Sequence, residues 1–156
     1  MLHIRYNNQV PETSSEPKLF GDLLALARHS WVLEMAQRLE GLGYRDYRRS
    51  DAIILRWLRH GPMPLSQLDH ALGVSRQAAR KLVDGLVVRE FADVERDRGD
   101  ARRLNVALTA NGREYARNVL DVVTELNREL EGKLDPYDVV VAKAVLRTVS
   151  NLYGSE

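Results

Sequence analysis

The sequence predicts a mainly helical protein with one small β-hairpin, and two observations predict it. Apolar residues recur at spacings of three and four over most of residues 18–152, which is the period of helices buried on one face. The spacing changes to two only around residues 92–108, which is the period of strands. The length of 156 residues and the hydrophobic fraction of 44% suit one domain that buries its own core.

The N-terminal part divides into a tail and a long helix. Residues 1–17 are polar and without a period, so we interpret them as a flexible tail. From residue 18 the apolar positions keep helical spacing until Gly41 and Gly43 end the helix. These positions are Phe20, Leu24, Ala27, Trp31, Met35, Leu39 and Leu42.

A second helix is expected after a short polar loop. Ser50 is its predicted N-cap, because a hydroxyl can accept a bond from a free backbone N–H of the first turn. The residues expected to face inward are Ile53, Ile54, Trp57 and Leu58. Gly61 and Pro62 then break the chain.

Residues 64–88 have the pattern of two short helices joined by a tight turn. Leu65, Leu68 and Leu72 share one face of a helix that Gly73 ends. Ser75 is the predicted cap of the next helix, in which Ala78, Leu82 and Leu86 are expected to face inward. The residues expected on its outer face are Arg76, Gln77, Ala79, Arg80 and Lys81. This is a helix-turn-helix pattern, and its second helix is the candidate reader of DNA.

A β-hairpin is expected directly after these helices. Leu104, Val106 and Leu108 alternate with more polar residues, and residues 92–95 are the expected partner strand. The tip, residues 96–102, is rich in arginine, and Gly99 can take the positive φ that such turns often need. A helix-turn-helix followed by such a hairpin is a winged helix.

The same stretch resembles the multiple-antibiotic-resistance regulator (MarR) family of bacterial transcription factors. The resemblance rests on LGVSRQAARKLVDGL, DRGDAR and VALTANG and covers roughly residues 18–152. It is most specific at Asp100-x-Arg102 followed by Val106-x-Leu108-Thr109-x-x-Gly112. It implies a dimeric repressor or activator with the wing arginine in the minor groove. Two residues differ from the family pattern: Asp69 replaces a small Ala, and Glu90 replaces the Gly that ends the recognition helix, which predicts a different helix exit.

Two further helices are expected after the wing. Thr109 can cap the first, whose apolar residues are Tyr115, Val119, Val122, Val123, Leu126 and Leu130. Asp135 and Pro136 separate it from the last helix, which carries Val141, Val145, Val149 and Leu152. These stripes could seal the chain's own core or pair with a second copy, and the resemblance favours a homodimer. We therefore expect residues 49–112 to bind DNA and residues 18–48 and 113–156 to form the dimer.

The DNA contacts can be assigned by role. Arg76, Gln77 and Arg80 are the candidates for reading bases in the major groove. The candidates for phosphate contacts, which set register, are Ser66, Gln67, Ser75 and Lys81. Arg98 and Arg102 are expected in or beside the minor groove, with Asp100 orienting an arginine. Two readers in a dimer imply a near-palindromic operator with half-sites about one helical turn apart.

The resemblance also implies a small effector, often aromatic or anionic, in a cleft between the dimer helices and the winged module. The residues with which a search would begin are His29, Trp31, Tyr44, Trp57 and Arg113. Such a ligand would change the spacing of the two recognition helices.

Other functions have little support in the sequence. There is no Cys, and the four histidines do not form a metal-ligand spacing with carboxylates. No motif of an enzyme is present, so we predict no catalytic residue, no cofactor and no metal. No apolar run could span a bilayer and no secretion signal is present, which makes the cytoplasm the default location.

The charge is weak for a DNA-binding protein. The net charge is +1, although residues 75–103 carry eight cations against six acids and residues 117–156 carry five against seven. The alternative is therefore a winged helix that binds protein, such as an anti-repressor. Salt dependence distinguishes the two, because binding through phosphates weakens steeply as salt rises.

Overall fold

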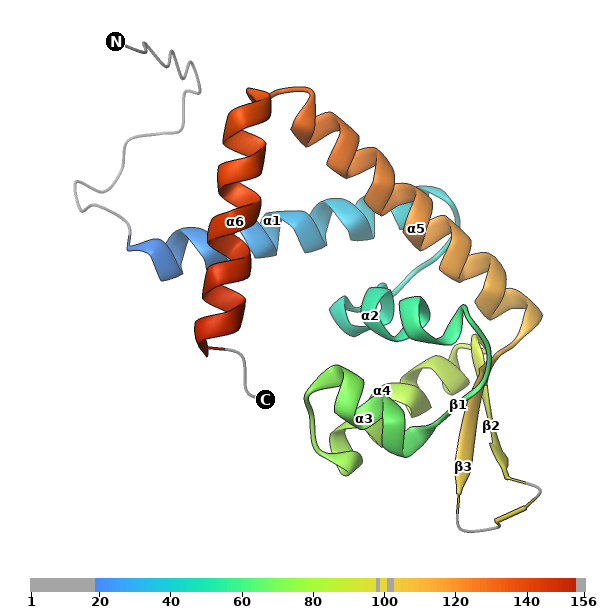
Figure 1. Ribbon diagram of the computed structural model, residues 1–156. Helices are drawn as coiled ribbons and strands as arrows, with labels where there is room; N and C mark the ends of the chain where they lie inside the picture. The colour runs from blue at the N-terminus through green and yellow to red at the C-terminus, as the bar shows by residue number, and fades with distance from the viewer. Residues whose placement is uncertain (1–18, 98, 101–102, 154–156) are drawn as a thin grey trace, which may run out of the picture.

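The computed structural model describes residues 19–97, 99–100 and 103–153. The helices are α1 (Phe20–Gly41), α2 (Arg49–Leu58), α3 (Leu65–Leu72), α4 (Arg76–Val88), α5 (Ala110–Glu131) and α6 (Pro136–Tyr153). The strands are β1 (Met63–Pro64), β2 (Ala92–Arg96) and β3 (Leu104–Leu108). The elements from α2 to β3 form the winged-helix part, and α5 runs from the wing to α6 (Figure 1). This architecture confirms the predicted mainly helical winged helix-turn-helix.

The sheet has three antiparallel strands in the order β1-β3-β2, one more than the predicted hairpin. In the hairpin, Val94 lies opposite Val106 and Ala92 opposite Leu108, with all four side chains on one face. On the other edge of β3, Met63 is also paired with Val106. A strand of two residues is too short for a period of two to appear in the sequence, which is why β1 was missed.

The turn between α3 and α4 forms as predicted. Gly73 ends α3 with a φ of 62°, and the Ser75 hydroxyl accepts a hydrogen bond of 3.2 Å from the backbone N–H of Ala78. The inward face of α4, however, is rotated by one residue from the predicted one. Ala79 is fully buried with Val83 and Leu86, while Ala78 and Leu82 are half-buried. The expectation that Ala79 lies outside is wrong, because Ala79, Val83 and Leu86, at spacings of four and three, form the buried stripe of α4.

Glu90 replaces glycine in sequence but not in conformation. Its φ is 60°, the left-handed region that glycine occupies without steric penalty. The backbone N–H of Phe91 still bonds the carbonyl of Leu86 at 2.9 Å, as in a glycine-type helix end. The expected change of helix exit is therefore wrong, and the chain adopts the glycine geometry with a strained glutamate.

The start and the buried face of α2 also differ from expectation. The N-cap is Arg48, and its backbone N–H bonds the Asp51 carboxylate at 3.1 Å, so Ser50 already lies within the helix. Ile53 and Trp57 are each 46% exposed. The buried stripe instead contains Asp51, Ile54, Leu55 and Leu58. Two adjacent isoleucines make either stripe compatible with the sequence, and only the packing against α5 selects one.

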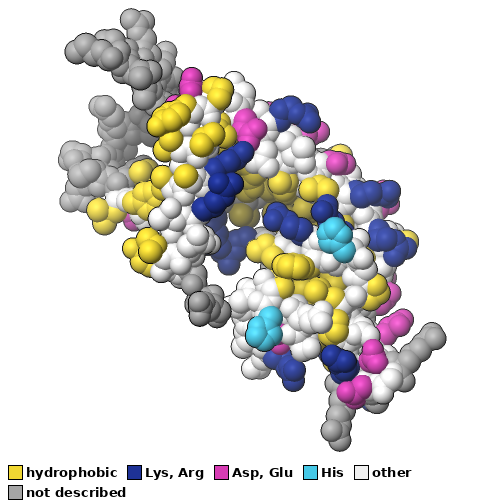
Figure 2. Space-filling model, viewed as in Figure 1, with side chains coloured by type: hydrophobic (Ala, Val, Ile, Leu, Met, Phe, Trp, Pro, Cys, Tyr) yellow, Lys and Arg dark blue, Asp and Glu magenta, His cyan; other side chains and the backbone are white. Residues whose placement is uncertain are grey.

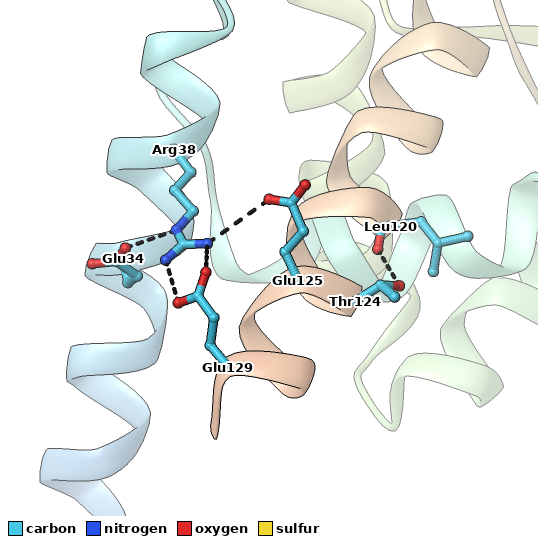
Figure 3. Close-up of polar contacts among 6 residues, drawn as sticks. All are labelled: Glu34, Arg38, Leu120, Thr124, Glu125 and Glu129. Carbon is cyan, nitrogen blue, oxygen red and sulfur yellow. Dashed lines mark hydrogen bonds and ion pairs between the residues drawn. The ribbon is translucent and has the colours of Figure 1, made fainter. Parts of the chain in front are cut away.

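The helix α5 holds the winged-helix part against α1. Its cap is Thr109, whose hydroxyl accepts a bond of 2.9 Å from the backbone N–H of Gly112, as predicted. Near its C-terminal end, the guanidinium of Arg38 on α1 bonds both carboxylate oxygens of Glu129 at 2.7 and 2.8 Å (Figure 3). Glu34 accepts a third bond from Arg38 and Glu125 lies 3.8 Å from it. These bonds lower the pKa of Glu129 and raise that of Arg38.

The last helix has no buried residue among those described. Most of its apolar side chains are exposed, as are most of those in the first half of α1. In the view of Figure 2, hydrophobic side chains gather over α1 and α6, and Lys and Arg side chains surround the hollow between these helices and the winged-helix part. None of the helices in the described ranges is long and apolar enough to cross a membrane.

Candidate DNA-binding surface

The first turns of α4 present polar side chains to solvent. Arg76, Gln77 and Lys81 are exposed, and the side chain of Arg76 is 76% exposed. Arg80 is half-buried, and its Nε donates a bond of 2.8 Å to Asp84 one turn later. Three of the predicted DNA-contacting side chains on α4 therefore lie free of the core, while Arg80 is held along the helix.

The helix α3 supplies a second set of polar groups beside α4. Ser66 is half-buried and Gln67 is exposed, both in the first turn of α3. Asp69, on the same helix, lies 3.8 Å from the Nε of Arg76, and its side chain is only 14% exposed. The family's small residue is thus replaced by a carboxylate that pairs with the first arginine of the recognition helix.

The base of the wing is organised by Asp97. Its carboxylate accepts hydrogen bonds from the Asn105 side chain at 2.9 Å and from the backbone N–H groups of Gly99 and Asp100 at 2.8 and 3.1 Å. These three donors keep the pKa of Asp97 below its ordinary value. The predicted minor-groove residues Arg98 and Arg102 lie outside the described residues. Asp100, predicted to orient an arginine, is described, and its carbonyl accepts a bond of 2.8 Å from the N–H of Arg103.

A buried ion pair joins α2, the end of α4 and α5. The Asp51 carboxylate is 1% exposed and accepts bonds of 2.7 and 2.8 Å from Arg89 and of 2.9 Å from the Tyr115 hydroxyl. Arg89 follows directly after α4, so this carboxylate fixes the end of the recognition helix to the rest of the fold. The sequence analysis missed this cluster. The available signal was the position of Asp51, which lies three residues before Ile54 and seven before Leu58 and so falls on the same apolar stripe of the helix.

The surroundings of this ion pair shift the pKa values of its neighbours. Burial opposes the charge of Arg89, but the bonds and charge of Asp51 outweigh it and raise the arginine's pKa. Burial and the nearby carboxylate also raise the pKa of Tyr115, and they raise that of Tyr47 to about 12. Both phenols therefore stay protonated at neutral pH, and Tyr115 remains a hydrogen-bond donor to Asp51.

The five predicted effector residues do not line one cavity in the described part of the chain. Tyr44 stacks in an aromatic cluster with Tyr115 and Phe91, at ring distances of 4.8 and 6.2 Å, and its hydroxyl accepts a bond of 2.8 Å from Asn118. Trp31 is half-buried against the core, and Trp57 is nearly half exposed.

The other two predicted effector residues line separate clefts. His29 lines one of about 320 Å³ between α1 and the start of α2, together with Arg28 and Arg49. Arg113 lines another of about 590 Å³, which we call the α5 cleft. Its walls include Arg59 and Arg117, the acid Glu114, and the apolar residues Leu108, Ala110, Ala116 and Leu120. Three arginines over an apolar floor suit an anion with an apolar body.

The described residues contain no cluster of His, Asp and Glu side chains that could hold a metal ion.

Comparison with known proteins finds a family model that matches part of this surface. Residues 46–103 match the model of the MarR family. No curated protein sequence matches the chain.

Solved structures share the fold over most of the chain. The MepR–DNA complex of Staphylococcus aureus is 20% identical with a TM-score of 0.73, covering 87% of this chain and 99% of that one. A mutant MarR of Escherichia coli, complexed with operator DNA, is 21% identical with a TM-score of 0.70, covering 83% and 91%. BpsR of Bordetella bronchiseptica, whose DNA binding is regulated by 6-hydroxynicotinic acid, is 23% identical with a TM-score of 0.69, covering 90% and 100%.

At these identities the structures establish the fold alone, and the family model matches the winged-helix segment. The matched residues run from the loop before α2 to the base of β3 and include α3, α4 and the wing. This chain thus has the winged-helix fold of these solved structures, and its residues 46–103 are similar to the MarR family.

Proposed function

We propose that the protein is a homodimeric, sequence-specific DNA-binding transcriptional repressor acting in the bacterial cytoplasm on a near-palindromic operator. The observation that carries the proposal is the first half of α4, which presents Arg76, Gln77 and Lys81 to solvent. The buried face of α4 packs on the core of the winged-helix part and so holds these side chains at the surface. The DNA bound to MepR and to the mutant E. coli MarR in structures of the same fold supports the assignment.

Apolar surface that this chain leaves uncovered supports the proposed dimer. Large hydrophobic residues of α1 and α6 that are at least 40% exposed are Phe20, Leu23, Leu26, Leu33, Tyr137, Val140, Val141, Val145, Leu146, Leu152 and Tyr153. Such a concentration is typical of an interaction surface rather than of a solvated one. A second copy that crosses these helices about a two-fold axis would bury them and place two recognition helices on one face.

We further propose that a small anionic effector, aromatic or otherwise apolar in its body, regulates DNA binding. The α5 cleft supports this, because Arg59, Arg113 and Arg117 line it together with apolar residues, and a carboxylate can accept bonds from arginine N–H groups. Arg113 already donates one bond of 2.9 Å to the Leu108 carbonyl, so its remaining N–H groups would bind the ligand. Regulation of BpsR by 6-hydroxynicotinic acid supports the same class of ligand. Of the predicted effector residues, Arg113 has the strongest case. His29, Trp31, Tyr44 and Trp57 remain predictions for the assembled dimer.

The experiment is a fluorescence-anisotropy titration with a duplex taken from upstream of this protein's own coding region. It uses random competitor DNA and two salt concentrations. The parent is expected to bind tightly and more weakly at high salt, and Gln77→Ala and Arg102→Ala are each expected to weaken binding. The matched control, Arg128→Ala, removes an exposed charge from α5, far along the helix from the wing. If random competitor DNA abolishes binding to the upstream duplex, sequence-specific recognition of that duplex is contradicted.

One observation favours a second function, that of a protein-binding winged helix or anti-repressor. Two arginines of the recognition helix are already paired with acids, Arg76 with Asp69 and Arg80 with Asp84. The neighbouring carboxylates reduce the net positive charge that this helix presents to phosphates. A protein interface would respond little to salt, so the salt dependence in the same titration separates the two functions.

A further inference from the structure

A small cleft lies where α3, α4 and the base of the wing meet. Its volume is about 140 Å³, and its lining residues are Pro64, Leu65, Ser66, Arg76, Arg103 and Leu104. The cleft thus brings two arginines from distant parts of the chain to the first turn of α3. This volume is several times the roughly 30 Å³ that a liquid water occupies, so the free oxygens of a phosphate can enter.

Arg103 is presented to this cleft by a fixed backbone. Its N–H donates a bond of 2.8 Å to the carbonyl of Asp100, and its own carbonyl accepts one of 2.9 Å from the N–H of Asp97. The next residue, Leu104, begins β3 and is paired with Arg96. The side chain of Arg103 is exposed, so the backbone is held while the guanidinium is open to a ligand.

Arg76 approaches the cleft from the first turn of α4. Asp69 approaches it only to 3.8 Å, at Nε, which is too long for a hydrogen bond. The carboxylate therefore orients the arginine without using the two N–H groups that suit a phosphate.

The floor of the cleft adds backbone donors. Pro64 is the N-cap of α3, and no side chain caps this helix end within the described residues. The free N–H groups of a first helical turn favour an anion, and Ser66, which lines the cleft, lies in this turn.

We propose that this cleft binds one backbone phosphate of duplex DNA, held by Arg103 and Arg76 and by the first turn of α3. The site rests on the proposed DNA-binding function and adds to it a contact from Arg103, which the sequence analysis did not select. It also changes the role of Arg76 from a base reader to a phosphate contact. Gln77 is then the residue of this turn that is free to read a base.

The test is the salt dependence of DNA binding by Arg103→Gln, measured by anisotropy on the upstream duplex and on a random duplex. Each phosphate contact contributes about 0.9 to the slope of log K against log salt, so a dimer that loses two contacts loses about 1.8. When salt rises from 50 to 200 mM, the fold-loss of affinity is therefore expected to be about twelve times smaller for the variant than for the parent. The loss is expected on both duplexes, since a phosphate contact carries no sequence information.

Two variants separate this site from a general effect of charge. Arg103→Lys keeps the charge and is expected to keep most of the slope, whereas Arg128→Gln removes an equal charge from α5 and is expected to leave the slope within about 0.3 of the parent's. A slope for Arg103→Gln equal to that for Arg128→Gln would overturn the phosphate site.

The outcomes also separate the site from the proposed function. If the parent binds random DNA as tightly as the upstream duplex, sequence-specific regulation at that region fails. The slope of Arg103→Gln on random DNA still decides the phosphate site in that case. A parent that binds neither duplex at 50 mM salt would overturn both.

Discussion

The buried carboxylate of Asp51 offers the most demanding test of how this fold is held together. Asp51→Ala removes the acceptor of four hydrogen bonds, two from Arg89 and one each from the Tyr115 hydroxyl and the Arg48 backbone. Asp51 is 1% exposed and the Arg89 side chain 13%, so the guanidinium would be left in a largely dry site without its counter-charge.

The magnitude follows from that burial. Removing one partner of a buried ion pair costs about 3–5 kcal/mol of unfolding free energy. For a chain of this size each kcal/mol lowers the midpoint of thermal unfolding by about 2–4 °C, so the expected drop is about 6–20 °C at a fixed protein concentration. The matched control is Asp84→Ala. Its ion pair with Arg80 has nearly the same length, 2.8 Å against 2.7 Å, but the two side chains are 49% and 43% exposed, and the expected cost is about 0.5 kcal/mol or less.

Urea unfolding followed by tryptophan fluorescence and by circular dichroism measures both costs. The double variant Asp51→Ala/Arg89→Ala is expected to cost less than the sum of the single variants, because the second substitution removes the unpaired charge that the first creates. Equal costs for Asp51→Ala and Asp84→Ala would refute the reasoning, since the two pairs differ in burial and hardly in length.

Three further predictions concern the backbone and the wing. Glu90→Gly is expected to stabilise the fold by about 0.5–1 kcal/mol. It relieves the left-handed strain of about 1–2 kcal/mol, and the greater freedom of glycine in the unfolded chain offsets part of this gain. Glu90→Ala keeps the strain and should give no gain in the same urea titration. Gly112→Ala places a Cβ 1.8 Å from the Phe91 carbonyl oxygen and is expected to destabilise the fold by about 1–3 kcal/mol or more. The control is Gly21→Ala, which also lies in a first helical turn but has open space around it. Thermal unfolding should show this control to be neutral or mildly stabilising. The pKa of Asp97, measured by carbon-detected NMR, should lie below the value of about 3.9 of an unfolded aspartate. Its contribution to stability is then fully present above that value and is lost as the pH falls through the lower, folded-state pKa, and Asn105→Ala should move the pKa back toward the ordinary value. An Asp97 that titrates at the ordinary pKa would mean that its three hydrogen bonds do not hold the wing in solution.

The sequence predicted best where one local pattern decides the structure. The alternation of Leu104, Val106 and Leu108 located β3 residue for residue, and the hydroxyls of Ser75 and Thr109 located the starts of α4 and α5. In each case the deciding interaction lies within a few residues along the chain, so the sequence contains it.

The sequence predicted least where a distant partner decides. Asp51 is buried because Arg89, 38 residues away, supplies its counter-charge. The exposure of Trp57 depends on which face of α2 meets α5, and nothing close to it in sequence makes that choice. The cleft that contains Arg103 exists only because the wing folds back to the first turn of α3.

The uninterrupted course of α5 has a mechanical consequence. Its 22 residues begin directly after the last strand of the wing and span about 33 Å, at about 1.5 Å per residue. Gly112 allows α5 to pack against the Phe91 backbone, and Asp51 joins Tyr115 of α5 to Arg89 at the end of α4. These contacts predict that α5 moves together with the winged-helix part. A tilt of only about 10° at its far end would carry the near end through about 6 Å, roughly half the width of the major groove. In the proposed dimer, a slight change of angle between the two α5 helices would therefore be enough to move both α4 helices out of register with one turn of DNA.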